Sequence, residues 1–449
     1  MSLEISREPI DIGVALNSAY TLLNVALLLF LILGISFFYS GLTQRKAAFQ
    51  QLSFPLVVTI EILLLWLCFG YSLSFSQTGR SGYLGNFEHV GLKELSSMVI
   101  YPNQRFDDVS TGVVEQVYSV YSGLFACISA VIAMGCLCER GKLKPAMIFL
   151  VAWMFLVYCP VAYWIWNSNG WMHKKFEVLD FAGGHAVHIV SGTTALMYSW
   201  FLGYRNENSL TDYRSSNLGL VVCGTMFMAI GWLGFNCGSL YTVNKLSGII
   251  LCNTLTSMMV AGLSWMGLDY LYSRNGRISI VGLCSGCVAG LTAITPCTAY
   301  ISFWSSFVVG LLSGVLCNLG TRLKYWLKID DSLDVGIHLI GGLVGNLLAG
   351  VFGDKSVAAL GGLSVHGGWI NRHFIQLLYQ FLSSLITTIY VAGVCFIILF
   401  VLVRIPGCHL RMDSESEMEG SDSAVFNSEY MSDYVEFVRQ LNPDDYKEE

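Results

Sequence analysis

The chain has 449 residues, of which 54% are hydrophobic and 12% are charged. A soluble globular domain carries about twice that charged fraction, so the composition excludes an ordinary soluble enzyme or binding module. The net charge of −6 arises mostly in an acidic C-terminal tail and gives no reason to expect nucleic-acid binding.

Long apolar runs recur along the chain, each close to the ~20 residues that a membrane-spanning helix needs. We expect the first, from near Ala15, to be a membrane span and not a cleaved signal peptide. The pattern predicts an all-α polytopic membrane protein with about eleven transmembrane helices, at 18–40, 52–75, 114–136, 145–166, 181–203, 217–240, 247–270, 279–296, 302–323, 333–353 and 374–403.

Cations gather in alternate loops of this pattern. The breaks after the odd-numbered segments carry Lys and Arg clusters such as Arg45-Lys46, whereas the long loop from Gln77 to Val113 also holds acidic residues. The positive-inside rule therefore predicts an extracellular N-terminus and a cytoplasmic C-terminus. We expect a membrane domain over 1–404 and a cytoplasmic acidic tail over 405–449.

The fifth and tenth segments share a spacing. Asp180 precedes His188 by eight residues, and Asp330 precedes His338 by eight. Segments five apart in order cross the membrane in opposite directions, as in an inverted five-helix repeat around a central pore. Eight residues are about 12 Å of helix, which would carry each His toward the middle of the membrane.

Each residue of this pattern has a structural interpretation beside a functional one. Asp180 stands directly before an apolar helix, where a carboxylate caps backbone N–H groups. An imidazole at membrane depth is costly and usually faces a pore or a polar partner. A second His at the matching position makes His188 and His338 a candidate pair in the pore.

The segment Asp180-Phe-Ala-Gly-Gly-His-Ala-Val-His188 closely resembles the signature of the ammonium transporter family, which includes bacterial and plant Amt proteins and fungal Mep permeases. Further segments resemble the family in the same order along the chain: Phe38-Tyr-Ser-Gly-Leu42, Gly70-Tyr-Ser-Leu-Ser-Phe75, Phe125-Ala-Cys127, Gly231-Trp-Leu-Gly-Phe-Asn236, Ile294-Thr-Pro296 and Asp330-Asp-Ser-Leu-Asp334. The tail from Leu410 to Glu436 is most similar to that of fungal permeases.

The resemblance implies a homotrimer in the plasma membrane, with a pore in each subunit for ammonium or methylammonium. It implies an outer vestibule that binds the substrate, formed by Trp166, Ser239, Tyr121 and Asp180. Below the vestibule it implies a gate of two stacked rings, Phe125 and Phe235. Below the gate it implies a twin-His pore, formed by His188 and His338. An aromatic face attracts a cation by about 0.5–2 kcal/mol. Packing of the hydrophobic core is the alternative role for these rings.

An apolar tube below the gate would disfavour a bare cation and favour neutral imidazoles. We expect ammonium to lose its proton at the entrance, after which ammonia passes the two His rings and the proton moves separately through them. Asp180 would stabilise the cation indirectly and fix the start of the fifth helix.

Three features depart from the family pattern. The segment Asp334-Val-Gly-Ile-His338 is one residue shorter than usual, which could rotate the helix start or be absorbed in the loop before it. His185 occupies a position where the family has a small residue. Glu61 lies at an unusual depth in the second segment. We expect no cofactor and no metal site, because His185 and His188 lack an evident third ligand.

The tail carries Ser414, Ser416, Ser421 and Ser423 among carboxylates. Such a segment is either a solvated extension or a regulatory one, bound to cytoplasmic loops and switched by a regulator or kinase. Two other functions remain open: an ammonium sensor that signals with little transport, and a membrane metalloenzyme. The enzyme is disfavoured because only two deep His residues are found where several ligands are needed.

Overall fold

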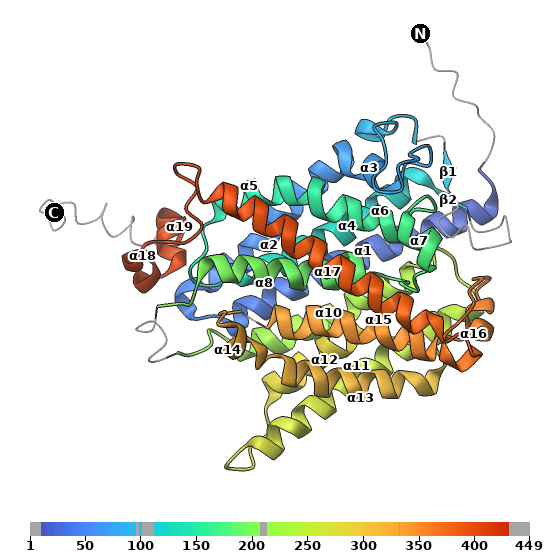
Figure 1. Cartoon of the computed structure of the whole chain (residues 1–449). Helices are drawn as coiled ribbons and strands as arrows, with labels where there is room; N and C mark the ends of the chain where they lie inside the picture. The colour runs from blue at the N-terminus through green and yellow to red at the C-terminus, as the bar shows by residue number, and fades with distance from the viewer. Residues whose placement is uncertain (1–9, 96–97, 101–111, 207–212, 332, 431–449) are drawn as a thin grey trace, which may run out of the picture.

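The structure is a computed structural model that describes residues 10–95, 98–100, 112–206, 213–331 and 333–430. Long helices lie side by side in one bundle (Figure 1). The helices α18 (Ser414–Glu419) and α19 (Ser421–Tyr430) lie at one end, which we call the tail end. The strands β1 (Val99–Ile100) and β2 (Val113–Val114) lie at the opposite end, which we call the strand end.

Within the described residues, nine helical runs are long and apolar enough to cross a membrane. The shorter apolar helix α12 (Ile280–Ile294) and the mostly buried run Gly184–Leu202 match the two remaining predicted segments. The eleven segments contain α1 (Ile12–Leu42), α2 (Ala48–Leu65) with α3 (Tyr71–Phe75), α4 (Glu115–Ala133), α5 (Leu143–Trp153) with α6 (Cys159–Trp166), α8 (Val190–Leu202), α10 (Leu218–Gly238), α11 (Lys245–Tyr272), α12 (Ile280–Ile294), α13 (Phe303–Gly320), α15 (Ile340–Phe352) and α17 (Ile375–Leu402).

Short elements connect these helices. The strands β1 and β2 pair antiparallel, with Val99 opposite Val114, so the all-helical prediction needs this one small addition. The remaining short helices are α7 (Trp171–Phe176), α14 (Leu323–Leu327) and α16 (Lys355–Ala359), and the 3₁₀ turns are η1 (Arg45–Ala47), η3 (Val90–Leu92), η6 (Met134–Leu137) and η10 (Trp369–Asn371).

Four membrane segments contain a π-helical turn: η2 (Trp66–Gly70), η7 (Met154–Tyr158), η8 (Gly184–Ile189) and η9 (Val335–Leu339). Such turns are rare and occur frequently at functional sites. The turns η8 and η9 open the fifth and tenth segments, and each contains one of the two predicted pore histidines.

Small residues bring the helix backbones close together, as expected in a membrane bundle. A Cβ on Gly34 of α1 would lie 2.5 Å from the backbone nitrogen of Met228 in α10. Contacts this short require glycine, and they leave no room for lipid between α1 and α10. The core beside this interface is rich in buried aromatic side chains, among them Trp66, Trp153 and Trp232.

Candidate functional site

The two predicted pore histidines meet in the middle of the bundle. Nδ1 of His188 lies 3.3 Å from Nδ1 of His338, and the rings are nearly parallel at 20° with centroids 5.4 Å apart. Both residues are buried. A contact of this length is a hydrogen bond in which one ring donates and the other accepts, so the two imidazoles share one proton.

Glycines allow this contact between the two helix starts. A Cβ on Gly192 of α8 would lie 2.4 Å from the backbone nitrogen of Leu339, next to His338. A Cβ on Gly342 of α15 would lie 3.0 Å from the Cβ of His188. Each glycine therefore lies one helical turn beyond one His and packs against the segment that carries the other.

The two predicted gate residues stack on each other beside His188. The rings of Phe125 in α4 and Phe235 in α10 are 4.2 Å apart at an interplanar angle of 16°. The centroid of Phe235 lies 6.2 Å from that of His188. Trp232 lies one helical turn before Phe235. Its ring stacks on that of His188, with the centroids 5.5 Å apart and the rings nearly parallel. Sequence reasoning missed Trp232, although its spacing from Phe235 on a helix face was visible.

A cavity of about 50 Å³ lies on the strand-end side of the gate. Phe125, Trp166 and Ser239, three of the predicted residues, line it. The remaining lining residues, which the sequence did not single out, are Phe75, Tyr118, Ser122, Phe181 and Tyr241. The cavity is aromatic on several sides and carries hydroxyl groups, which suits a small cation.

Tyr121 occupies a different place from the one predicted. It is not among the described residues that line the cavity. Its hydroxyl donates to the backbone carbonyls of Gly234 and Phe235, each at 3.0 Å, and its ring packs 5.1 Å from that of Phe125. Tyr121 therefore supports both rings of the gate from behind.

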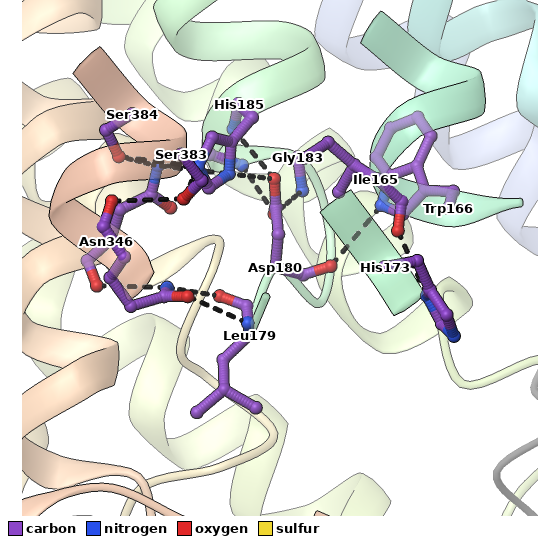
Figure 2. Close-up of polar contacts among 12 residues, drawn as sticks. Ile165, Trp166, His173, Leu179, Asp180, Gly183, His185, Asn346, Ser383 and Ser384 are labelled. Carbon is purple, nitrogen blue, oxygen red and sulfur yellow. Dashed lines mark hydrogen bonds and ion pairs between the residues drawn. The ribbon is translucent and has the colours of Figure 1, made fainter. Parts of the chain in front are cut away.

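Asp180 caps the start of η8, as the sequence predicted. Its Oδ1 accepts the backbone N–H groups of Gly183 and Gly184 at 2.7 Å, and its Oδ2 accepts that of His185 at 2.7 Å. The backbone carbonyl of Asp180 accepts the indole N–H of Trp166 at 3.3 Å. Figure 2 shows Asp180 between the helix start and Trp166, so the cap is joined to the wall of the cavity.

His185 also binds Asp180 through its side chain. Nδ1 of the ring lies 2.9 Å from Oδ2 of Asp180, and Nε2 lies 2.9 Å from the hydroxyl of Ser383 and 3.3 Å from that of Ser384, both in α17. The amide of Asn346 in α15 packs against the same ring at 3.2 Å (Figure 2). His185 thus faces α17, away from the His188–His338 pair.

Comparison with known proteins identifies the family. The sequence profile of the Ammonium Transporter Family matches residues 19–430. This chain belongs to that family. It is 38% identical to ammonium transporter MEP3 of Saccharomyces cerevisiae, over 94% of this chain and 84% of that protein. It is 37% identical to ammonium transporter 2 of Schizosaccharomyces pombe, over 94% of this chain and 82% of that protein.

The fold is that of a solved family structure. The crystal structure of Candida albicans Mep2 matches this family member with a TM-score of 0.83 and 34% identity, over 93% of this chain and 91% of that chain. The predicted family and fold class are therefore confirmed. The protein is a multi-pass membrane protein of a transporter family, and the enzyme alternative is set aside.

The shortened segment before His338 keeps this His in contact with His188. Figure 1 shows α15 between α14 at the tail end and α16 at the strand end, whereas α8 follows α7, which lies toward the strand end, and runs toward the tail end. The fifth and tenth segments thus run in opposite directions, as predicted. Asp334 accepts a hydrogen bond from the hydroxyl of Tyr39, and both residues line a cavity of about 10 Å³ together with His338. Sequence reasoning noted Asp334 only as part of a motif.

Charged groups surround the tail end of the tenth segment. The guanidinium of Arg205 pairs with Asp330 at 2.8 Å and with Glu139 at 3.1 Å. Burial opposes ionisation of Asp330, but its hydrogen bonds to Arg205 and the nearby charge of Arg140 outweigh this and lower the pKa of the carboxyl to about 2. The pair therefore remains ionised throughout the physiological range.

The ion pair of Arg205 and Asp330 should stabilise the folded protein fully at neutral pH and less in acid. Because the pKa of Asp330 is depressed in the folded state, the stabilisation is complete above its unfolded value of about 4 and is lost as the pH falls toward about 2. We expect the difference in melting temperature between wild type and Asp330→Asn to stay constant from about pH 8 to about pH 5 and to shrink below about pH 4. A difference that instead varied between pH 5 and 8 would contradict the assigned pair.

The described part of the tail is bound to the bundle. Asp422, which is buried, accepts the backbone N–H groups of Phe49 and Gln50 at the start of α2, at 3.0 and 2.7 Å. Glu417 pairs with Arg411 at 2.6 Å and accepts the backbone N–H of Asn206. The tail therefore contacts the start of α2 and the residue that follows Arg205. The part of the predicted tail from 431 onward, including Asp433 to Glu436, lies outside the described residues.

Proposed function

We propose that this protein transports ammonium across the plasma membrane. It recruits ammonium as a cation in the cavity at the strand end, removes its proton at the gate and conducts ammonia past the two His rings. The single observation that carries the proposal is the order of the parts: an aromatic cavity, the stacked Phe125 and Phe235, and then the buried His188–His338 pair.

Recruitment of the cation follows from the cavity wall. Trp166, Tyr118 and Tyr241 supply aromatic faces, each of which attracts a cation by about 0.5–2 kcal/mol. The hydroxyl of Ser239 donates to the backbone carbonyl of Phe235 at 2.9 Å. Because its proton is used in that bond, the hydroxyl oxygen is available to accept a hydrogen bond from ammonium.

Loss of Ser239 should weaken substrate binding. A hydrogen bond to a charged group contributes about 1.5–3 kcal/mol, which is equivalent to about tenfold to 100-fold in affinity. We expect Ser239→Ala to raise the KM for methylammonium by about tenfold while the maximal rate changes less. Kinetics of labelled methylammonium uptake measure both quantities. An unchanged KM would show that Ser239 does not bind the cation.

Deprotonation follows from the mostly apolar surroundings of the path below the gate. Between the stacked rings and the His pair, the rings of Phe235 and Trp232 contact His188, and the cavity beside His338 is lined mostly by apolar side chains, with Asp334 and Tyr39 as further polar members. An isolated cation in an apolar environment is strongly disfavoured. Ammonia, which is neutral, avoids this cost. His188 and His338 can then offer it the ring nitrogens that their mutual hydrogen bond leaves free.

The proton moves separately through the two imidazoles. Each ring can accept a proton on one nitrogen and release another from the other nitrogen, so a linked pair can pass a proton along. Asp334 and Tyr39 share a cavity with His338. They are the polar groups next to His338 on the tail-end side, where ammonium forms again.

We assign the strand end to the outside and the tail end to the cytoplasm, because the cationic loops lie at the tail end. We further propose that three copies assemble as a homotrimer in the lipid bilayer, with one pore each. The bound tail is a regulatory segment, on which a cytoplasmic regulator or kinase acts. Its contacts with α2 and with the loop beside Arg205 are the observation that supports this role.

Uptake of labelled methylammonium tests the proposal. Cells that lack their own ammonium permeases are expected to gain uptake when they express this chain, and ammonium should compete with it. If wild-type protein reached the cell surface and gave no uptake, transport would be wrong and a sensor would take its place.

A further inference from the structure

A buried carboxylate lies at the strand end of α4, close to the outer cavity. Glu115 is the first residue of α4 and directly follows β2, which lies at the strand end (Figure 1). Only 7% of the residue is exposed. Glu115 lies outside the segments that resemble the family, and none of the transport steps proposed above uses it.

Two contacts hold Glu115 in place. Its backbone N–H donates to the carbonyl of Met98 at 3.0 Å, next to the pairing of β1 with β2. The hydroxyl of Tyr71 in α3, which is fully buried, donates to Oε1 of Glu115 at 2.7 Å. The hydrogen bond from Tyr71 and the first-turn position in α4 both stabilise a negative charge on this side chain.

Among the residues that the structure describes, no Lys, Arg or His forms an ion pair with Glu115. A buried charge is normally paired with an opposite charge, because removing it from water is costly. A cation bound in the neighbouring cavity would provide such an opposite charge. Glu115 therefore differs from Asp180, whose carboxylate contacts the imidazole of His185.

Tyr118 connects Glu115 to the cavity. It follows Glu115 by three residues on α4, so the two side chains lie on the same helix face, and it lines the cavity. Its ring packs against that of Tyr71, with centroids 6.2 Å apart, and against that of Tyr241, another lining residue, at 5.2 Å. These phenol groups are uncharged, so they do not neutralise the carboxylate behind them.

We propose that Glu115 provides the negative charge that attracts ammonium into the outer cavity. It is not one of the residues that line the cavity, so it acts through space and does not bind the cation directly. The inference rests on the proposed function, because it assumes that the cavity beside Tyr118 and Trp166 binds ammonium.

The charge of Glu115 should affect binding and not the later steps. A unit charge about 10 Å from the cation, at an effective dielectric constant of about 40, changes the affinity by about fourfold. Glu115 lies on the outer side of the gate, whereas the His188–His338 pair lies beyond it. Its loss should therefore raise the KM and change the maximal rate much less.

Three variants separate the charge of Glu115 from its hydrogen bond. Glu115→Gln removes the charge but keeps an oxygen that can accept from Tyr71, and we expect it to raise the KM for methylammonium by about threefold to fivefold. Glu115→Asp keeps the charge, and Tyr71→Phe keeps the charge but removes the hydrogen bond, so both should stay within about twofold of the wild-type KM. Kinetics of labelled methylammonium uptake in permease-deficient cells measure these values.

Glu177→Gln is the matched control. It removes a carboxylate that follows α7, where the side chain is 49% exposed and pairs with His366 at 3.2 Å. Because water screens an exposed charge, the KM of this variant should remain near that of wild type. An equal rise in KM for Glu177→Gln and Glu115→Gln would show a general effect of surface charge and would contradict the role of Glu115.

The outcomes separate this inference from the proposed function. If wild type transports but Glu115→Gln keeps the wild-type KM, or if Tyr71→Phe raises the KM as much as Glu115→Gln does, the charge of Glu115 does not recruit the cation. Surface labelling and size-exclusion chromatography establish that each variant is folded.

If surface-expressed wild type fails to transport, the proposed function is wrong, and calorimetry of methylammonium binding to the purified protein tests Glu115 separately. Binding that is about threefold to fivefold weaker in Glu115→Gln would support the inference. Equal binding by both proteins, or no binding by either, would overturn it.

Discussion

His188→Ala is expected to lower the rate of methylammonium uptake by about tenfold to 100-fold. The substitution removes the imidazole that lies 3.3 Å from Nδ1 of His338 and leaves the Thr292 hydroxyl at 3.4 Å as the contact of that nitrogen. A hydrogen bond to a charged group contributes about 1.5–3 kcal/mol, and its loss at the point where the proton is transferred corresponds to this range of rates. It also removes one of the two groups that accept the proton. Uptake of labelled methylammonium in permease-deficient cells measures the effect.

A matched control uses a His elsewhere in the chain. His366 is exposed, so His366→Ala should retain nearly wild-type uptake. His338→Ala should resemble His188→Ala, because the two rings act as one unit and their losses should not add. Normal uptake by either pore variant would show that the His188–His338 pair does not lie in the conduction path.

The second large effect is expected at Asp180. In Asp180→Ala, three backbone N–H groups and the imidazole of His185 lose their acceptor inside the protein. Each unsatisfied group costs about 1–3 kcal/mol, so the total approaches the whole stability of many proteins. We expect little monodisperse protein and a melting temperature lower than wild type by at least about 10 °C. Fluorescence-detected size-exclusion chromatography with a thermal ramp gives both quantities.

A second N-cap in the chain provides the comparison. Asp354 caps α16 through the backbone N–H of Ser356 at 2.9 Å, in an exposed position. Because water can replace this acceptor, Asp354→Ala should cost only about 0.5–2 kcal/mol. Equal melting temperatures for the Asp180→Ala and Asp354→Ala variants would show that the cap at Asp180 contributes no more to stability than an exposed N-cap.

The helices could be predicted because a membrane imposes a length and a composition on each of them. The errors lie at boundaries that depend on local capping. The first helix begins at Ile12 and not near residue 18, because Asp11 accepts the backbone N–H groups of Gly13 and Val14. The fifth begins at Gly184, after Gly183 with its φ of 122°. No period in the sequence signals the π turns that follow.

The residues of the candidate site could be predicted where they lie in segments that resemble the family. His188, His338 and the two gate rings could be chosen by resemblance, and the structure brings them together. The contacts of His185 with Ser383 and Ser384 join positions about 200 residues apart and have no local signal. Nothing in the structure explains Glu61, whose Oε2 is buried without a hydrogen-bond partner among the described residues.

The most direct test of the central claim compares ammonium with potassium in liposomes that contain purified protein. If ammonia and the proton cross separately, an ammonium gradient should drive charge movement through wild type, whereas an equal potassium gradient should drive none. His188→Ala should lose the ammonium-driven current or admit potassium. An ammonium-driven current in His188→Ala with unchanged exclusion of potassium would contradict conduction past the twin-His pair.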